Sequence, residues 1–179
     1  MCIRDSLSHA GKQTCLDAIE VSNKPVAISH ANPNFFHKSK RNIDTDILQK
    51  LVKKNGFIGL SLYPYHLKNL GDCTIEDFCE MIKELVNLIG EDNIGIGSDL
   101  CLNWPDDVVM WMRNGKWTKN IDYGESKDKN PKWPKLPSWY KQPSDLNNLF
   151  FLICENNIPE KVSTKIIGQN WFNFMKNQF

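Results

Sequence analysis

The sequence predicts an α/β protein, specifically a partial (β/α)8 barrel of the TIM type with roughly the last four βα units and a set of C-terminal helices. Three short apolar runs, centred near Ile28, Leu60 and Ile96, have the length and composition of buried strands. They lie about one βα unit apart, with helix-like stretches between them, which is typical of a parallel sheet with right-handed crossovers. The predicted strands cover residues 25–28, 57–63 and 94–97.

A fourth strand end is predicted near the start of the chain. Leu7-Ser8-His9 has the same apolar-Ser-His order as Ile28-Ser29-His30, 21 residues later, and the stretch 12–23 between the two carries apolar residues on roughly one helical face. Residues 1–6 match neither pattern and are treated as an unmatched leader. Four strand ends cannot close an eight-stranded barrel, so we expect the carboxyl-terminal half of one.

Two longer helices are predicted over residues 43–55 and 74–89, and a glycine follows each of them. Asp44 is available as the N-cap of the first helix. Thr74 and Asp77 have the spacing of a capping box at the start of the second.

Helical periodicity is lost from residue 104 to 143. This segment holds five of the six tryptophans, with several lysines and prolines, and it predicts an insertion or rim loop with one short helix near residues 106–113. Ser144 or Asp145 can cap the next helix. The domain prediction is therefore a half-barrel over 7–103, the insertion over 104–143, and C-terminal helices over 144–179, namely 146–155, 160–167 and an aromatic segment that starts at Gly168.

Composition excludes several classes of function. Lys and Arg number 22 against 21 Asp and Glu, so no global charge attracts nucleic acid. The longest apolar run, 149–154, is too short to span a membrane. The six cysteines show no C-x-x-C spacing and are expected to be reduced thiols. We favour a cytoplasmic location and leave open a targeting region upstream, because the first residues resemble no signal peptide.

Four polar side chains are the candidate site residues. His9 and His30 follow apolar-Ser pairs at two strand ends, where neutral imidazoles could ligate zinc. Arg41, eleven residues after His30, could clamp a carboxylate, and Asp99 could orient or deprotonate a metal-bound water. The ordinary alternatives are structural histidines, a solvated basic cluster and a turn cap. The other two histidines, at 37 and 66, are expected to be surface or packing residues.

The ordered set of these motifs resembles the renal-type membrane dipeptidases, which are zinc metallopeptidases on a (β/α)8 barrel. The resemblance implies that His9 and His30 ligate the second of two zinc ions, that Arg41 binds the carboxylate of a dipeptide or small amide substrate, and that Asp99 assists the bridging water. The matching pieces are Leu7-Ser8-His9, Pro25-Val26-Ala27-Ile28-Ser29-His30, Lys40-Arg41-Asn42-Ile43, Phe57-Ile58-Gly59, Ile94-Gly95-Ile96-Gly97-Ser98-Asp99 and Ile167-Gly168-Gln169-Asn170-Trp171-Phe172.

The sequence departs from that family in three places. It contains no His-x-Asp motif, Ser6 replaces the aspartate expected before Leu-Ser-His, and Asp99-Leu100-Cys101-Leu102 replaces Asp-Phe-Asp-Gly. The family's bridging glutamate would also lie on an earlier strand. We therefore expect an inactive fragment that binds metal weakly. The alternatives are a noncatalytic module that binds through the aromatic segment Trp104 to Trp139, or another metal-dependent amidohydrolase barrel, and a homodimer is left open.

Overall fold

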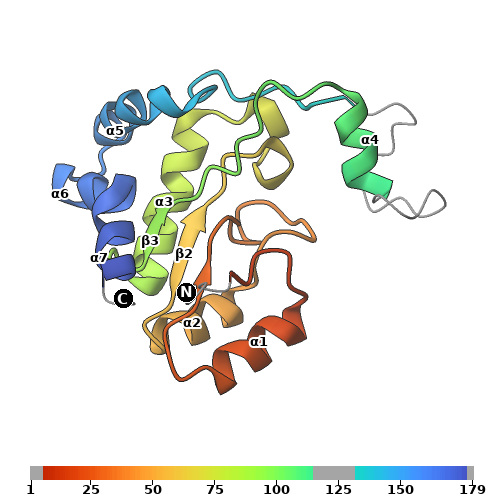
Figure 1. Ribbon diagram of the computed structural model, residues 1–179. Coiled ribbons are helices and arrows are strands. Elements are labelled where there is room, and N and C mark those ends of the chain that lie inside the picture. The colour runs from red at the N-terminus through yellow and green to blue at the C-terminus, as the bar shows by residue number, and fades with distance from the viewer. Residues whose placement is uncertain (1–5, 115–131, 177–179) are drawn as a thin grey trace.

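The computed structural model describes residues 6–114 and 132–176. Helices and short strands alternate through its first hundred residues, and helices follow (Figure 1). In chain order the elements are α1 (Lys12–Val21), β1 (Ala27–Ile28), α2 (Thr45–Lys53), β2 (Phe57–Leu60), the 3-10 turns η1 (Pro64–His66) and η2 (Leu70–Asp72), α3 (Ile75–Ile89), β3 (Ile94–Ile96), α4 (Asp107–Asn114), the 3-10 turn η3 (Pro143–Asp145), α5 (Leu146–Glu155), α6 (Glu160–Thr164), the π-helical turn η4 (Lys165–Gln169) and α7 (Asn170–Lys176).

The three strands form one parallel sheet in the order β1-β2-β3, so the predicted α/β class is confirmed. Ile58 of β2 pairs with Ile28 on one side and with Ile94 on the other. The fourth predicted strand end is present only as a single parallel bridge between Ser6 and Ala27, with a hydrogen bond of 2.9 Å from the Leu7 N–H to the Ala27 carbonyl. The described part of the sheet is therefore smaller than four full strands.

Both faces of the sheet are covered, which explains why the strands read as continuous apolar runs. On one face Ile58, Leu60 and Ile94 share a core with the apolar residues of α2 and α3, such as Leu48 and Ile82. On the other face the Phe57 ring lies 4.2 Å from that of Trp171 and 5.2 Å from that of Phe174, measured between ring centroids. These two aromatic residues belong to α7, which runs beside β3 (Figure 1).

The predicted caps of α2 and α3 differ in outcome. Thr74 accepts a hydrogen bond of 3.1 Å from the Asp77 N–H, and Gly90 ends α3 with a φ of 80°, a conformation that favours glycine. Asp44 occupies the N-cap position of α2, but its carboxylate makes no cap bond. It accepts instead from Lys12 at 2.9 Å and from Asn34 at 2.6 Å. Asp44 thus joins α1 and the loop after β1 to the start of α2.

The boundary predicted between the helix over 160–167 and the aromatic segment that starts at Gly168 is absent. Helical structure continues from Glu160 to Lys176, with the extra residue of a π turn accommodated in η4. Directly after this turn, the amide of Asn170 donates to the Ile94 carbonyl and the indole of Trp171 donates to the Ile96 carbonyl, each at 2.8 Å. Helix side chains therefore satisfy carbonyl groups of β3.

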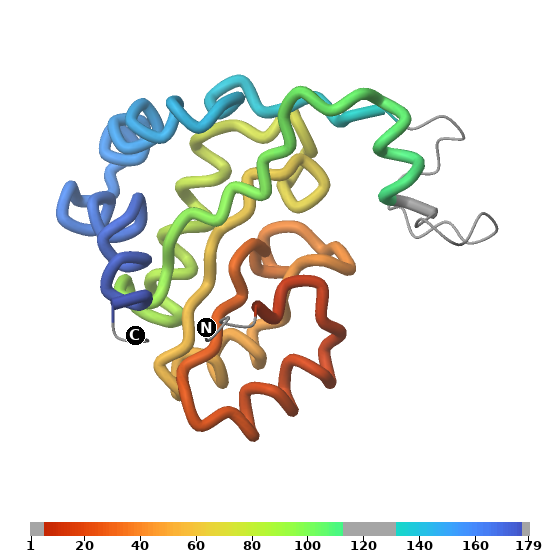
Figure 2. The backbone as a smooth tube through the Cα atoms, in the orientation of Figure 1, coloured from red at the N-terminus to blue at the C-terminus, as the bar shows by residue number. Residues whose placement is uncertain are grey.

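The two described flanks of the tryptophan-rich segment lie side by side, as the adjacent green and cyan stretches show (Figure 2). The Trp133 indole donates to the Pro105 carbonyl at 3.2 Å, and the Trp139 indole donates to the Cys73 carbonyl at 2.8 Å. Trp139 is buried, whereas Trp104 and Trp111 are exposed. Trp117 lies outside the described residues, and the proposed domain division stays a prediction.

Two findings concern membrane spans and cysteines. No helix within residues 6–114 and 132–176 is long and apolar enough to cross a bilayer. Each of the five cysteines in the same part of the chain is a free thiol, namely Cys15, Cys73, Cys79, Cys101 and Cys154.

Candidate active site

His9 and His30 meet at the carboxyl ends of the first two chain segments of the sheet. The Ser6–Ala27 bridge sets these segments side by side and parallel, so the residues that follow them emerge at one rim. The Nε2 atoms of the two imidazoles lie 2.8 Å apart, and their ring centroids are 5.0 Å apart. The structure thus brings together the two residues that the sequence singled out as metal ligands.

Three serines support this pair. The Ser8 hydroxyl accepts a hydrogen bond of 3.0 Å from the His30 backbone N–H, and the Ser29 hydroxyl lies 2.9 Å from His30 Nδ1. The Ser6 and Ser29 hydroxyl oxygens are 2.7 Å apart. The repeated Ser-His order therefore has a physical purpose, because serines from both segments fix the backbone and ring of His30.

Arg41 approaches the same pair from the end of the loop after β1. Its Nη1 lies 2.5 Å from His9 Nδ1, and its backbone N–H donates to the Ser39 hydroxyl at 3.0 Å. Burial lowers the pKa of His9, and the nearby positive charges of Arg41 and His30 lower it further. His9 is consequently a neutral imidazole at neutral pH.

Asp99 comes to the rim from the carboxyl end of β3. Its backbone is left-handed, with a φ of 52°, which aspartate tolerates better than most residues. One carboxylate oxygen lies 3.9 Å from His30 Nε2, and the side chain is 29% exposed. Burial raises the pKa of this carboxyl, although His30 and Arg41 oppose the rise. All four predicted site residues therefore gather at one rim, while their roles stay predictions.

Sequence reasoning missed a buried set of polar residues beneath this rim, which we call the amide clamp: Asn32, Asn42, Ser61 and His66. The Asn32 side chain accepts from the Ser61 N–H at 3.0 Å and donates to the Ser61 carbonyl at 2.9 Å and the His66 carbonyl at 3.0 Å. Ser61 thereby leaves the β2 ladder, so the strand ends at Leu60 rather than at residue 63 as predicted.

Asn42 completes the amide clamp from the other end of the loop. Its side-chain oxygen accepts from the Asn32 N–H at 3.0 Å, and its amide donates to the His66 carbonyl at 3.0 Å and the His37 carbonyl at 2.7 Å. Asn32 lies two residues after His30, and Asn42 follows Arg41 directly. The clamp therefore fixes both ends of the loop that carries a histidine and the arginine of the rim.

His66 is buried, so of the two expected roles, surface or packing, it has the packing role. Its Nδ1 lies 2.7 Å from the Ser61 hydroxyl. Burial lowers its pKa to about 3, and the positive charges of His30, His9, Arg41 and His37 add to this effect. His66 is therefore a neutral structural imidazole beneath the rim.

The rim fits part of a zinc site. Tetrahedral zinc with bonds of about 2.0–2.1 Å would separate two ligand nitrogens by about 3.3 Å, so the Nε2 atoms of His9 and His30 need to move apart by only about 0.5 Å. Within residues 6–114 and 132–176, no group of three or more His, Cys, Asp or Glu side chains could hold an ion. The described residues thus supply two imidazole ligands of a site that needs others.

Comparison with known proteins finds similarity to a dipeptidase, an amidohydrolase and a metallo peptidase. The chain is 30% identical over 95 residues to an uncharacterised dipeptidase of Schizosaccharomyces pombe, which covers 52% of this chain and 23% of that one. An amidohydrolase from Pseudomonas aeruginosa has 29% identity and a TM-score of 0.87, covering 97% of this chain and 52% of that one. A metallo peptidase from Rhodobacter sphaeroides, liganded with a phosphinate mimic of the dipeptide L-Ala-D-Ala, shares the fold at 18% identity and a TM-score of 0.73, covering 97% of this chain and 42% of that one.

The chain spans less than a third of the length of the curated dipeptidases it matches. The family model for membrane dipeptidases matches residues 4–106, more than half of the chain. This match includes both rim histidines, Arg41 and Asp99, and the solved relatives carry the same arrangement of elements. The chain therefore belongs to the membrane dipeptidase family, peptidase family M19.

Proposed function

We propose that this chain forms the carboxyl-terminal half of the barrel of a zinc-dependent dipeptidase, which hydrolyses dipeptides or related small amides by a metal-activated water. The observation that carries the proposal is the convergence of the His9 and His30 Nε2 atoms, 2.8 Å apart, at the rim that also holds Arg41 and Asp99. Imidazole ligands, a cation for a carboxylate and a carboxylate with a raised pKa are the groups that this reaction needs.

Each side chain has a distinct role in the proposal. His9 and His30 would hold one of two zinc ions through Nε2. Zinc supplies a Lewis acid and a bound water that ionises near neutral pH. Arg41 would bind the substrate carboxylate with two parallel hydrogen bonds and so orient the scissile amide. Asp99 would accept the proton of the attacking water, since its raised pKa brings it closer to the working pH.

The isolated chain should be inactive and should bind zinc weakly. Two imidazoles leave most of the coordination sphere of an ion to water, and no third ligand joins them among the described residues. A His-x-Asp pair and a bridging glutamate, which the sequence lacks, would have to come from the remainder of a longer protein.

The test compares zinc content and dipeptide hydrolysis in a complete protein that contains this chain. His30→Ala should reduce bound zinc and lower the hydrolysis rate by at least about 100-fold, because a ligand is lost. His37→Ala is the matched control, since the structure places its side chain outside the imidazole pair, and it should change both quantities little. Full zinc content in His30→Ala, or stoichiometric zinc and hydrolysis in the isolated chain, would overturn the proposal.

A noncatalytic aromatic module is the weaker candidate. The exposed Trp104 and Trp111 favour it, since exposed indoles can stack on sugars or bases. Trp133 and Trp139, however, use their N–H groups on carbonyls of the chain itself. Replacing Trp104 and Trp111 by alanine should therefore leave zinc content unchanged.

A further inference from the structure

The end of β1 carries one residue more than a regular strand. Because Ile28 is in register with β2, a regular parallel ladder would give the carbonyl of Gly59 to the N–H of His30. The N–H of Ala31 donates to the Gly59 carbonyl instead, at 3.0 Å. Ser29 and His30 together take the place of one residue, so they form a β-bulge, which we call the β1 bulge. Such bulges often lie next to active sites and change the direction of a side chain.

The two N–H groups of the β1 bulge bond to serines of the first chain segment. Ser29 donates to the Ser6 hydroxyl at 3.1 Å, and His30 donates to the Ser8 hydroxyl at 3.0 Å. Successive side chains of a strand alternate between its two faces, so one extra residue reverses the face on which each later side chain lies. The His30 ring thereby reaches His9, with the two Nε2 atoms 2.8 Å apart. The bulge therefore determines that the two imidazoles meet.

The carbonyl of Ser29 lies against two glycines of the neighbouring strand segments, Gly59 in β2 and Gly97 directly after β3. A Cβ added to either glycine would overlap the Ser29 carbonyl oxygen and would lie 2.9 Å from its carbon. Carbon atoms that are not bonded to each other pack at about 3.5–4.0 Å. The obstacle is backbone and cannot swing aside as a flexible side chain can. The β1 bulge therefore needs the space that these two glycines leave.

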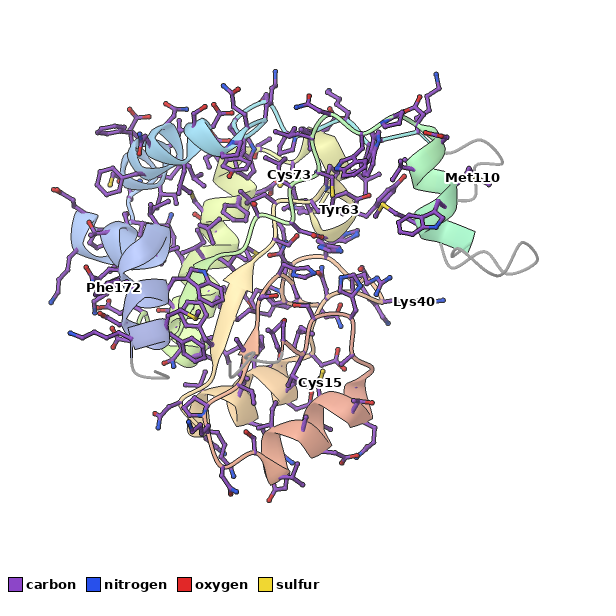
Figure 3. All side chains as sticks on the ribbon, in the orientation of Figure 1. Cys15, Lys40, Tyr63, Cys73, Met110 and Phe172 are labelled. Atoms are coloured by element: carbon purple, nitrogen blue, oxygen red, sulfur yellow. The ribbon has the colours of Figure 1, made fainter. Side chains whose placement is uncertain are left out.

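Gly95 lies on the same face of β3 as Gly97, two residues earlier, but meets different atoms. The three atoms nearest to a Cβ added there belong to the rings of Phe57 and Trp171, at 2.7–2.8 Å. Trp171 reaches the strands from α7, whereas the exposed Phe172 lies on the outer side of that helix (Figure 3). A side chain at Gly95 would therefore crowd two aromatic rings and leave the β1 bulge untouched.

We propose that Gly59 and Gly97 are positioning residues, which hold His30 against His9 because they admit the Ser29 carbonyl of the β1 bulge. The inference rests on the proposed function, in which the imidazole pair binds a metal. A methyl group at Gly97 would push the Ser29 carbonyl away from the sheet. Since the peptide unit is planar, the N–H and Cα of His30 would move with that carbonyl. The substitution would separate the two imidazoles without touching either of them.

The first test is proton NMR of the wild-type chain, recorded with a chelator and without metal. One Hα of Gly97 should be shifted downfield, because a carbonyl oxygen lies against it as the acceptor of a Cα–H contact. Gly11 is the reference, since no heavy atom lies within 4 Å of a Cβ added there, and its two Hα shifts should differ less. Ring protons of His9 and His30 should show a nuclear Overhauser effect. Equal Hα shifts at Gly97, or no Overhauser effect between the rings, would overturn the inference.

The second test compares Gly97→Ala and Gly59→Ala with the matched control Gly95→Ala. All three should lower the urea midpoint of unfolding, because each adds a methyl group to a packed site. Only Gly97→Ala and Gly59→Ala should lose the Overhauser effect between His9 and His30, and either variant suffices if the other does not fold. An effect that persists in both, or that is also lost in Gly95→Ala, would overturn the inference. These measurements need no hydrolysis, so their failure is distinct from failure of the dipeptidase proposal.

The third test measures dipeptide hydrolysis in a complete protein that contains this chain. Gly97→Ala should lower the rate at least about tenfold, since a small misplacement of a metal ligand has a large effect on rate. Gly95→Ala should change it by less than about twofold at a temperature where both variants are folded. Equal rates in the two variants would contradict the positioning role of Gly97.

Discussion

The rim cluster and the amide clamp lie in adjoining layers of one site and use polar residues in opposite ways. Every side chain of the clamp is buried, and within the described residues no buried side-chain nitrogen or oxygen lacks a hydrogen-bond partner. The rim residues His9, His30, Arg41 and Asp99 are partly exposed and bond mainly to one another. The clamp therefore stabilises the loop and fixes the position of its two ends. The rim holds side chains that can gain or lose a proton and change hydrogen-bond partners.

The pH dependence of unfolding gives the largest expected difference between the two layers. His66 has a pKa of about 3 in the folded chain, against the ordinary histidine value of 6.5 in an unfolded one, so below pH 6.5 the unfolded chain binds the extra proton. Stability is complete above pH 6.5 and should fall by roughly 4 kcal/mol as the pH drops to 3. Denaturant unfolding at several pH values measures this loss.

His66→Asn should remove most of this pH dependence, although it also lowers stability at neutral pH. His37→Asn is the control, because His37 is not buried in the clamp and its charge is only a minor cause of the low pKa of His66, so the pH dependence of unfolding should change little. If the free energy of unfolding of His66→Asn still falls with pH as in the wild type, another group titrates and the clamp is not the acid-sensitive layer.

The asparagine at the centre of the clamp gives the next largest effect. Asn32→Ala leaves the Ser61 N–H and the Ser61 carbonyl without their partner and leaves the His66 carbonyl with Asn42 alone, so it should destabilise the chain by about 3 kcal/mol. Asn34→Ala, in the same loop but only half buried, should cost about 1 kcal/mol. Urea unfolding of both variants measures the difference. Equal losses of stability in the two variants would mean that the buried clamp residue stabilises the chain no more than a half-buried residue of the same loop.

Sequence patterns predicted the alternation of strands and helices along the chain, because these patterns depend on residues that are close in sequence. The α3 helix begins and ends where the Thr74 cap and Gly90 place it. Apolar-Ser-His repeats also led to the rim, because parallel strands deliver their ends to one edge. Asn32 and Asn42, by contrast, have the composition of an ordinary loop. Their burial follows from contacts with residues about thirty positions away, which no local pattern encodes.

The boundary predicted at Gly168 is absent for a related reason. Helical structure continues through Gly168 with one π turn, and the contacts of Asn170 and Trp171 with β3 stabilise it. The only sequence signals for the clamp are positional, since one asparagine lies two residues after His30 and the other follows Arg41. Tertiary contacts overrode glycine propensity in one place and loop composition in the other.

Removal of a rim imidazole should affect metal binding far more than stability. His30→Ala should change the free energy of unfolding by no more than about 1 kcal/mol, because the side chain is partly exposed. The same unfolding series as for Asn32→Ala measures it. A loss of stability as large as that of Asn32→Ala would contradict the claim that the clamp, and not the rim, stabilises this part of the chain.

The smallest expected effect is a gain in stability. Because burial raises the pKa of Asp99 in the folded chain, the ionised carboxylate costs stability at neutral pH, above its folded pKa. Asp99→Asn should therefore stabilise the chain slightly at pH 7, and the gain should disappear below the ordinary aspartate pKa of 3.8. Exposed Asp106→Asn is the control. Thermal unfolding of both variants at pH 7 and below pH 3.8 measures the change in stability. A gain in stability of Asp99→Asn that persists below pH 3.8 would show that the ionised carboxylate is not its cause.

The most direct measurement is the position of zinc in crystals of a complete protein that contains this chain, located by anomalous scattering at the zinc edge. We predict an anomalous peak about 2.1 Å from the Nε2 atoms of both His9 and His30. A zinc-loaded, active protein whose peaks touch neither imidazole, or in which His9 and His30 still bond to each other, would contradict the account.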